Sequence, residues 1–174
     1  MQYTLHFNPD RCAECFACEV ACKSAHNLRP YAQEKPGSSG PRYRQVMTVS
    51  DGESAIQYIS ISCMHCGSPS CMSVCPAKAI SRDGEFGAVI VDQSKCLGCR
   101  YCSWACEFGA PQFGADGLMQ KCDLCIERLR EGEKPACVEN CCGGAITFGP
   151  VEKVESNVRA RAANRMMSAL SELK

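Results

Sequence analysis

The spacing of the cysteines constrains this chain more than any other feature. Residues 96–106 read C-x2-C-x2-C-x3-C, and the same spacing recurs over residues 12–22. In this pattern three closely spaced cysteines ligate one iron–sulfur cube, whereas the fourth ligates a neighbouring cube. Variants of the pattern occupy residues 63–75 and 122–141. Sixteen of the 17 cysteines therefore fall into four quartets, which predicts four [4Fe-4S] clusters.

Disulfides and zinc are the competing explanations for so many cysteines. A small secreted protein with this density would be a candidate for a disulfide scaffold. The count of 17 is odd, however, and C-x2-C pairs are too close in sequence to join distant segments. Zinc sites pair two C-x2-C knuckles across a gap and need no third and fourth cysteine at these spacings. Iron–sulfur ligation is therefore the favoured interpretation.

Charge and hydropathy exclude several classes of function. The formal net charge is zero, and no basic run indicates a nucleic-acid partner. No apolar run reaches the roughly 18–20 residues needed to cross a bilayer directly. No recognisable signal peptide precedes Cys12. We therefore expect a cytoplasmic protein with reduced thiols, and export in the folded state with a signal-bearing partner is the alternative.

Residues 63–106 have the full layout of a bacterial two-cluster ferredoxin. Two quartets flank a predicted hairpin, which turns at Asp83-Gly84 and continues into a strand over residues 88–92. Pro76 follows the last cysteine of the first of these quartets, as in bacterial ferredoxins. The second and third quartets are therefore predicted to form one module.

The first and last quartets each have half of the same layout. A predicted strand over residues 3–7 precedes the first quartet, and another over residues 144–148 follows the last. The corresponding strands of a ferredoxin pair with each other, so residues 1–22 and 107–150 should form a second module. The predicted fold class is α+β: two interlocked bacterial 2[4Fe-4S] ferredoxin-like modules, with small β-hairpins and short helices around the clusters.

Exchange of the fourth cysteine within each module gives four predicted sites. Site 1 comprises Cys12, Cys15, Cys18 and Cys141; site 2 Cys63, Cys66, Cys71 and Cys106; site 3 Cys96, Cys99, Cys102 and Cys75; site 4 Cys122, Cys125, Cys137 and Cys22. Cys142 is left over, and we expect it to be a small buried thiol.

Two further segments contain no cysteine. Residues 23–62 include predicted strands over 42–50 and 55–62, and are expected to pack over the clusters as an insertion. A docking surface for a partner is the alternative. Residues 151–174 carry an apolar residue at every fourth position, which predicts a helix packed on the body of the protein or against a partner.

Five single residues near the quartets carry expectations of their own. His65 is predicted to hydrogen-bond or pack rather than replace a thiolate ligand, because its quartet is complete. Trp104 and Phe108 are expected to exclude water from a cluster. Lys95 and Lys121 precede quartets, and a positive charge there should raise cluster potentials by favouring the more negative reduced state.

The predicted activity is electron transfer without catalysis. The sequence contains no glycine-rich dinucleotide turn and no phosphate loop. A cluster held by four protein thiolates has no open iron at which a substrate could react. The leading hypothesis is an electron-transfer subunit, with a free-standing diffusible polyferredoxin as the alternative and a structural metal protein as a third possibility.

The chain resembles the iron–sulfur subunit family of molybdenum and tungsten oxidoreductases, best known from dimethyl sulfoxide reductase. The matching phrases lie at residues 62–66, 96–102, 109–113, 121–125, 134–139 and 147–150. It is also similar to the polyferredoxin subunits of tungsten aldehyde oxidoreductases. Glu107 and Cys142 depart from the pattern, because relatives often have proline there, whereas Cys99 is intact.

The resemblance implies the same exchange of ligands between quartets. It also implies two partners for the chain. One is a large catalytic subunit holding a molybdopterin or tungstopterin, and the other is a second redox partner: a membrane anchor, a flavoprotein or a ferredoxin. The four clusters would then conduct electrons between these partners.

Overall fold

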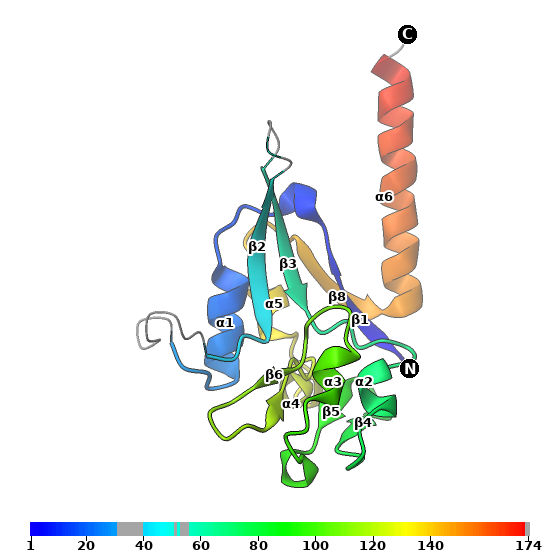
Figure 1. The fold of residues 1–174 in the computed structure, drawn as a ribbon. Coiled ribbons are helices and arrows are strands. Elements are labelled where there is room, and N and C mark those ends of the chain that lie inside the picture. Colours follow the sequence, from blue (N-terminus) through cyan, green and yellow to red (C-terminus); the bar gives the residue numbers. More distant parts are fainter. Residues whose placement is uncertain (31–39, 51, 53–55, 173–174) are drawn as a thin grey trace.

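The computed structural model describes residues 1–30, 40–50, 52 and 56–172 (Figure 1). Short strands and helices form the body, and one long helix extends from it. The strands are β1 (Tyr3–Phe7), β2 (Arg44–Ser50), β3 (Ile56–Ser62), β4 (Ile80–Arg82), β5 (Val89–Val91), β6 (Gln112–Phe113), β7 (Met119–Gln120) and β8 (Ile146–Pro150). The helices are α1 (Ala17–Ala25), α2 (Ser70–Ser73), α3 (Tyr101–Trp104), α4 (Ile126–Arg130), α5 (Ala136–Glu139) and α6 (Val151–Glu172), with 3-10 turns η1 (Pro9–Arg11) and η3 (Gln93–Lys95). The α+β class is confirmed.

Strands β1 and β8 join the two ends of the cysteine-bearing segment. They pair antiparallel from Tyr3 opposite Pro150 to Phe7 opposite Ile146, so the predicted pairing of these strands is confirmed. Tyr3 and Phe148 stack with ring centroids 5.2 Å apart. Helices α1 and α5 also pack on each other. The first and last quartets are therefore brought together.

Strands β4 and β5 form the hairpin predicted between the second and third quartets. They pair from Ile80 opposite Val91 to Arg82 opposite Val89. The Asp83 carboxylate accepts hydrogen bonds from the backbone amides of Glu85 and Phe86, at 3.0 and 2.7 Å. This side-chain turn links the two strands locally.

The predicted hairpin in the insertion is also present, as β2 and β3. Its register runs from Arg44 opposite Ser62 to Ser50 opposite Ile56. Residues 31–39 of the insertion, and residues 51 and 53–55 of the predicted turn, lie outside the described residues. Val46 of β2 is buried against Cys18 and Cys137, so the hairpin reaches the cysteine-rich interior.

A small hairpin in the connector between residues 107 and 121 was not predicted. It pairs β6 with β7, each only two residues long. Elements this short have no hydrophobic periodicity that a sequence could reveal. Met119 of β7 is 1% exposed and packs with Ile80, Val89 and Cys102.

Helix α6 forms as predicted, but it does not pack on the body along its length. Val154 in its first turns is buried against the body and Val158 is half-buried, whereas Ala162 is exposed and Met166 is 68% exposed. Figure 1 shows the helix extending away from the other elements. The expectation of a packed helix is therefore wrong beyond the first two turns, where the apolar side chains are exposed and the helix meets the body through polar side chains such as Arg165, which pairs with Asp10. Within the described residues no helix combines the length and apolarity that a membrane crossing requires.

Candidate iron–sulfur sites

Two cavities of similar size are each lined by one predicted quartet. The first, about 330 Å³ including space open to solvent, is lined by Cys12, Cys15, Cys18 and Cys141 together with Cys142. The second, about 350 Å³, is lined by Cys75, Cys96, Cys99 and Cys102. In each cavity, three closely spaced cysteines face one cysteine from a distant part of the chain. These are the sets of residues predicted for sites 1 and 3.

The backbone around these cavities shapes the loops and donates hydrogen bonds to sulfur. Phe16 and Arg100 have left-handed conformations, with φ of +57° and +67°, immediately before α1 and α3. The amide of Ala145 donates to Cys141 Sγ at 3.1 Å, and that of Ala79 donates to Cys75 Sγ at 3.3 Å. Amides directed at sulfur stabilise negative charge on thiolate ligands and tune cluster potentials.

The four cysteines predicted for site 4 form the most buried quartet. Cys22, Cys122, Cys125 and Cys137 are all between 4% and 7% exposed. Burial raises the pKa of Cys137 to about 11 and places that of Cys122 well above its ordinary value. The neighbouring thiols Cys22, Cys63 and Cys137 add to the rise at Cys122. Site 4 thus lies in the interior, next to a cysteine of site 2.

The cysteines predicted for site 2 are also neighbours. Burial raises the pKa of Cys71, and the thiols of Cys63 and Cys106 raise it further. Burial likewise raises the pKa of Cys102 to about 11, with Cys71 among the contributing neighbours. The cysteines predicted for site 2 therefore have neighbours among those predicted for site 4 and for site 3.

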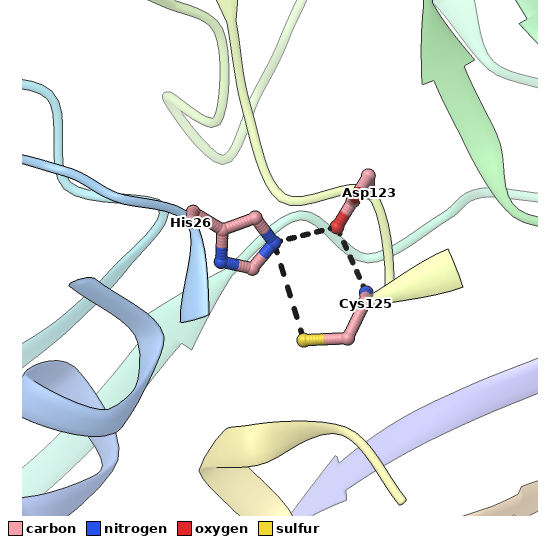
Figure 2. Close-up of side chains that lie close together, drawn as sticks. All are labelled: His26, Asp123 and Cys125. Atoms are coloured by element: carbon pink, nitrogen blue, oxygen red, sulfur yellow. Dashed lines mark hydrogen bonds and ion pairs between the residues drawn. The ribbon is translucent and has the colours of Figure 1, made fainter. Parts of the chain in front are cut away.

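A histidine and a carboxylate flank site 4 (Figure 2). His26 Nε2 lies 2.8 Å from Asp123 Oδ1 and 4.0 Å from Cys125 Sγ, and Asp123 Oδ1 also accepts the Cys125 amide at 2.8 Å. His26 Nδ1 lies 2.9 Å from the Cys22 carbonyl oxygen. Burial opposes charge on His26, but hydrogen bonds to Asp123, Cys125 and Cys22 more than offset it, so its pKa is raised. Burial opposes charge on Asp123 too, yet His26 lowers the pKa of that carboxyl.

Three cations are buried near the cysteines, and a fourth is not. Lys23, which follows Cys22, is 5% exposed, and its Nζ donates to the Arg29 carbonyl oxygen at 2.9 Å. Arg44 is 3% exposed and Lys121 is 4% exposed. Lys121 Nζ donates to the carbonyl oxygens of Cys122, at 2.9 Å, and Val89. The Lys95 side chain is 63% exposed and pairs with Asp92 at 2.9 Å. Solvent and Asp92 therefore screen the charge of Lys95, whereas that of Lys121 acts inside the protein.

His65 provides a test of whether this interior fits a cluster. Its Nδ1 accepts the Val89 amide at 2.9 Å, so Nε2 carries the proton in the neutral ring. Burial, with help from Lys121, lowers the pKa of His65 to about 3. The Nε2 atom is buried and has no partner among the described residues. An unpartnered buried donor between Cys63 and Cys66 fits a cluster whose sulfur atoms accept hydrogen bonds. The predicted hydrogen-bonding role of His65 is confirmed.

Two expectations about neighbouring residues are wrong. Trp104 is 80% exposed and therefore does not exclude water from the cysteines. Phe108 is 46% exposed. Cys142 is exposed rather than buried, and its Sγ lies 3.4 Å from Cys15 Sγ. The Gly143-Gly144 turn that follows Cys142 packs on Arg11, which leaves Cys142 at the rim of the first cavity.

The sequence reasoning missed His26, Asp123 and Arg44. His26 follows Cys22 by four residues at the end of a helix, and this spacing places both on one face. Asp123 stands between two cysteines of its own quartet. The sequence positions of His26 and Asp123 could therefore have identified both residues. Arg44 lies far in sequence from the cysteines near it, and only the fold shows that its side chain is buried against Ser60 and Ser62.

Comparison with known proteins decides the family. Residues 54–151 match the family described as 4Fe-4S dicluster domain. The chain belongs to this family. Its cofactors are accordingly [4Fe-4S] clusters, as the cysteine spacing predicted.

Curated relatives of this 4Fe-4S dicluster protein extend over nearly the whole sequence. It is 40% identical to the probable anaerobic dimethyl sulfoxide reductase chain YnfG of Escherichia coli, over 93% of its own length and 80% of that relative. It is 34% identical to the formate dehydrogenase iron-sulfur subunit of Wolinella succinogenes, over 89% and 84% of the two proteins. It is also 34% identical to a subunit of the sulfite dehydrogenase of Allochromatium vinosum, over 90% and 72%. Each relative is named as a chain or subunit of a reductase or dehydrogenase.

Proposed function

We infer that this protein is the non-catalytic electron-transfer subunit of an oxidoreductase complex, and that it carries four [4Fe-4S] clusters. The observation that carries this conclusion is the pair of cavities lined by the cysteines of sites 1 and 3. Each cavity combines cysteines from two distant segments, as ligand exchange between quartets requires. When bound, each cluster supplies one-electron storage.

The sixteen cysteines are assigned to sites 1 to 4 as the sequence suggested, and the sites follow one another in the order 1, 4, 2, 3. Helix α1 carries Cys18 of site 1 and Cys22 of site 4. Cys122 of site 4 is a neighbour of Cys63 of site 2, and Cys71 of site 2 is a neighbour of Cys102 of site 3. Sites 1 and 3, at the two ends of this order, each include an exposed cysteine, whereas the cysteines of sites 4 and 2 are all buried or half-buried. This order suits conduction between two partners.

We propose the modular organisation that the sequence suggested, and two strand pairs support it. Residues 1–22 with 107–150 form one ferredoxin-like module, supported by the β1–β8 pairing, and residues 63–106 form the other, supported by the β4–β5 hairpin. Residues 23–62 are the insertion, and residues 151–174 are the last segment, which contains α6.

The partners proposed are a large catalytic subunit with a molybdopterin or tungstopterin and a second redox protein, which could be a membrane anchor, a flavoprotein or a ferredoxin. The names of the dimethyl sulfoxide reductase, formate dehydrogenase and sulfite dehydrogenase relatives support a reductase or dehydrogenase complex. The zero formal net charge argues against nucleic acid. We place cluster assembly in the cytoplasm, where thiols stay reduced, with folded export beside a partner as the alternative.

Reductive titration of the anoxically purified protein tests the electron-transfer function. Absorbance in the visible range should bleach with uptake of about four electrons per polypeptide, one for each cube. The Cys142→Ser variant is the matched control, because Cys142 belongs to no proposed site, and it should accept the same number. A wild-type protein that does not bleach would contradict the proposal.

Purification from native cells separates the subunit from the diffusible polyferredoxin. The tagged protein, produced at its natural level, should co-purify with a large subunit that contains molybdenum or tungsten. A protein that migrates alone at every ionic strength and retains its clusters would support the diffusible carrier instead.

A further inference from the structure

Arg44 is a buried cation whose hydrogen-bonded serine partners are neutral. It is the first residue of β2 and is 3% exposed. Its Nη1 donates to Ser60 Oγ and its Nη2 to Ser62 Oγ, each at 2.8 Å. A buried charge is costly unless an opposite charge lies nearby, and neither hydroxyl supplies one. The charge that balances Arg44 must therefore come from other groups around it.

The groups around this guanidinium come from two different cysteine quartets. Burial opposes the charge of Arg44, but the nearby sulfur atoms of Cys137, Cys122 and Cys18 raise the pKa of the guanidinium, with Cys137 the strongest of the three. Cys137 and Cys122 belong to proposed site 4, whereas Cys18 belongs to proposed site 1. Arg44 therefore faces both sites of one module.

Ser60 extends the reach of Arg44 to site 1. The Ser60 hydroxyl oxygen accepts the hydrogen bond from Arg44 Nη1 and lies 3.7 Å from Cys18 Sγ. The hydroxyl proton remains available for the sulfur, so a donor chain runs from Arg44 through Ser60 to Cys18. Burial raises the pKa of Cys18, while Ser60 and Arg44 act against this rise.

We propose that Arg44 is a shared counter-charge for the clusters of sites 1 and 4, and that it raises both reduction potentials. This inference rests on the cluster assignment proposed above. A cube held by four thiolates is anionic and becomes more negative when it accepts an electron, so a fixed cation at short range in a dry interior stabilises the reduced form more than the oxidised form. The inserted hairpin thus contributes the charge that sets one end of the electron path.

A purely structural role for Arg44 would make a different prediction. The guanidinium also ties Ser60 to Ser62 on β3, so its removal could loosen the hairpin alone. Arg44→Gln removes the charge but keeps hydrogen-bonding capacity, and Arg44→Lys keeps the charge but not the two-pronged donor. Arg159→Gln on α6 is the matched control, because the Arg159 side chain is 76% exposed and pairs with Glu155 on its own helix.

The experiment is a potentiometric titration, monitored by electron paramagnetic resonance, of full-length variants with measured iron and sulfide. In Arg44→Gln with wild-type iron content, two of the four midpoint potentials should fall and the other two should not move. The midpoint potentials of Arg44→Lys should stay closer to those of the wild type, and the midpoint potentials of Arg159→Gln should equal those of the wild type. Four unchanged midpoints in Arg44→Gln would overturn the inference while leaving the proposed function intact, whereas a wild-type protein without iron and sulfide would overturn the proposed function.

Ser60→Ala keeps the test decisive if Arg44→Gln assembles fewer clusters. This variant retains the charge and removes only the hydroxyl between Arg44 and Cys18. One midpoint, that of the cluster held by Cys18, should fall and the other three should remain. A Ser60→Ala variant with all four midpoints unchanged would exclude the route from Arg44 to site 1.

Discussion

The two halves of this protein use the same local chemistry but obtain their surroundings from different segments. In each half a 3-10 turn precedes the quartet, a left-handed residue precedes the helix, and an alanine amide donates to the exchanged cysteine sulfur. Yet β4 and β5 are neighbours in sequence, whereas β1 and β8 stand at opposite ends of the body. The buried cations also come from different segments. Arg44 lies on the inserted hairpin, whereas Lys121 lies directly before the fourth quartet. Local motifs therefore specify ligands, and distant segments specify the electrostatic environment.

Removal of an exchanged cysteine should have the largest effect, and the same effect in both halves. Cys141→Ser should lose one cube from site 1, and Cys75→Ser should lose one from site 3, so each variant should retain about twelve iron atoms. Cys142→Ser should retain all of them, although Cys142 lines the same cavity as Cys141. Iron loss in Cys142→Ser but not in Cys141→Ser would reassign the ligand of site 1.

The two lysines that precede quartets should differ sharply. Lys121→Met removes a buried charge and leaves two carbonyl oxygens without their donor, so we expect a lower midpoint for the cluster near Cys71. Its apparent melting temperature should also fall by about 5 °C. Lys95→Met changes a solvated, paired side chain and should leave both quantities as in wild type. Equal shifts in both variants would show that burial does not decide the effect.

The ion pair of His26 and Asp123 joins the start of the insertion to the fourth quartet and should contribute a moderate, pH-dependent stability. His26→Gln should lower the apparent melting temperature by about 3 °C near pH 6. Because the folded pKa of His26 is raised, its contribution is complete below the ordinary value of 6.5 and shrinks as the pH rises above that value. The difference between wild type and variant should therefore be smaller at pH 9 than at pH 6.

A double variant provides the control for this pair. Asp123→Asn added to His26→Gln should cost little beyond the first substitution, because the two side chains act as a unit. Additive losses, or a difference that grows with pH, would contradict the ion pair.

The smallest effect is expected at the end of α6. Deletion of residues 163–174 removes the exposed ion pair between Arg165 and Asp10, at 2.9 Å, and a part of the helix whose described side chains are exposed. An exposed pair contributes about 0–1 kcal/mol, so iron content and all four midpoints should stay as in wild type. Loss of a cluster on deletion would show that the helix supports the body.

The sequence predicted the parts of the fold that the cysteines fix. The spacing from Cys96 to Cys106 identified candidate ligands, and the β1–β8 pairing followed from the missing halves of two ferredoxin layouts. The β6–β7 hairpin was not predicted, because strands of two residues show no hydrophobic periodicity. The apolar stripe of α6 suggested packing, but a stripe does not tell how far the body extends beneath it.

The residues that surround the cysteines were predicted less well, for a related reason. Arg44 acquires its position from the register that places it opposite Ser62, and a hairpin with apolar residues on both faces gives no local sign of which side chain turns inward. Trp104 was expected to shield a cluster because it stands two residues from Cys106, yet it is 80% exposed. Proximity in sequence thus identified candidate ligands and described their surroundings poorly.

The content of iron and acid-labile sulfide in the anoxically purified full-length protein tests the central claim most directly. Four cubes held by sixteen cysteines predict about sixteen of each per polypeptide. Zinc at full occupancy without sulfide would contradict the account. A value near twelve would contradict the four-cluster assignment, and the stretched quartet at residues 122–141 would be the first to re-examine.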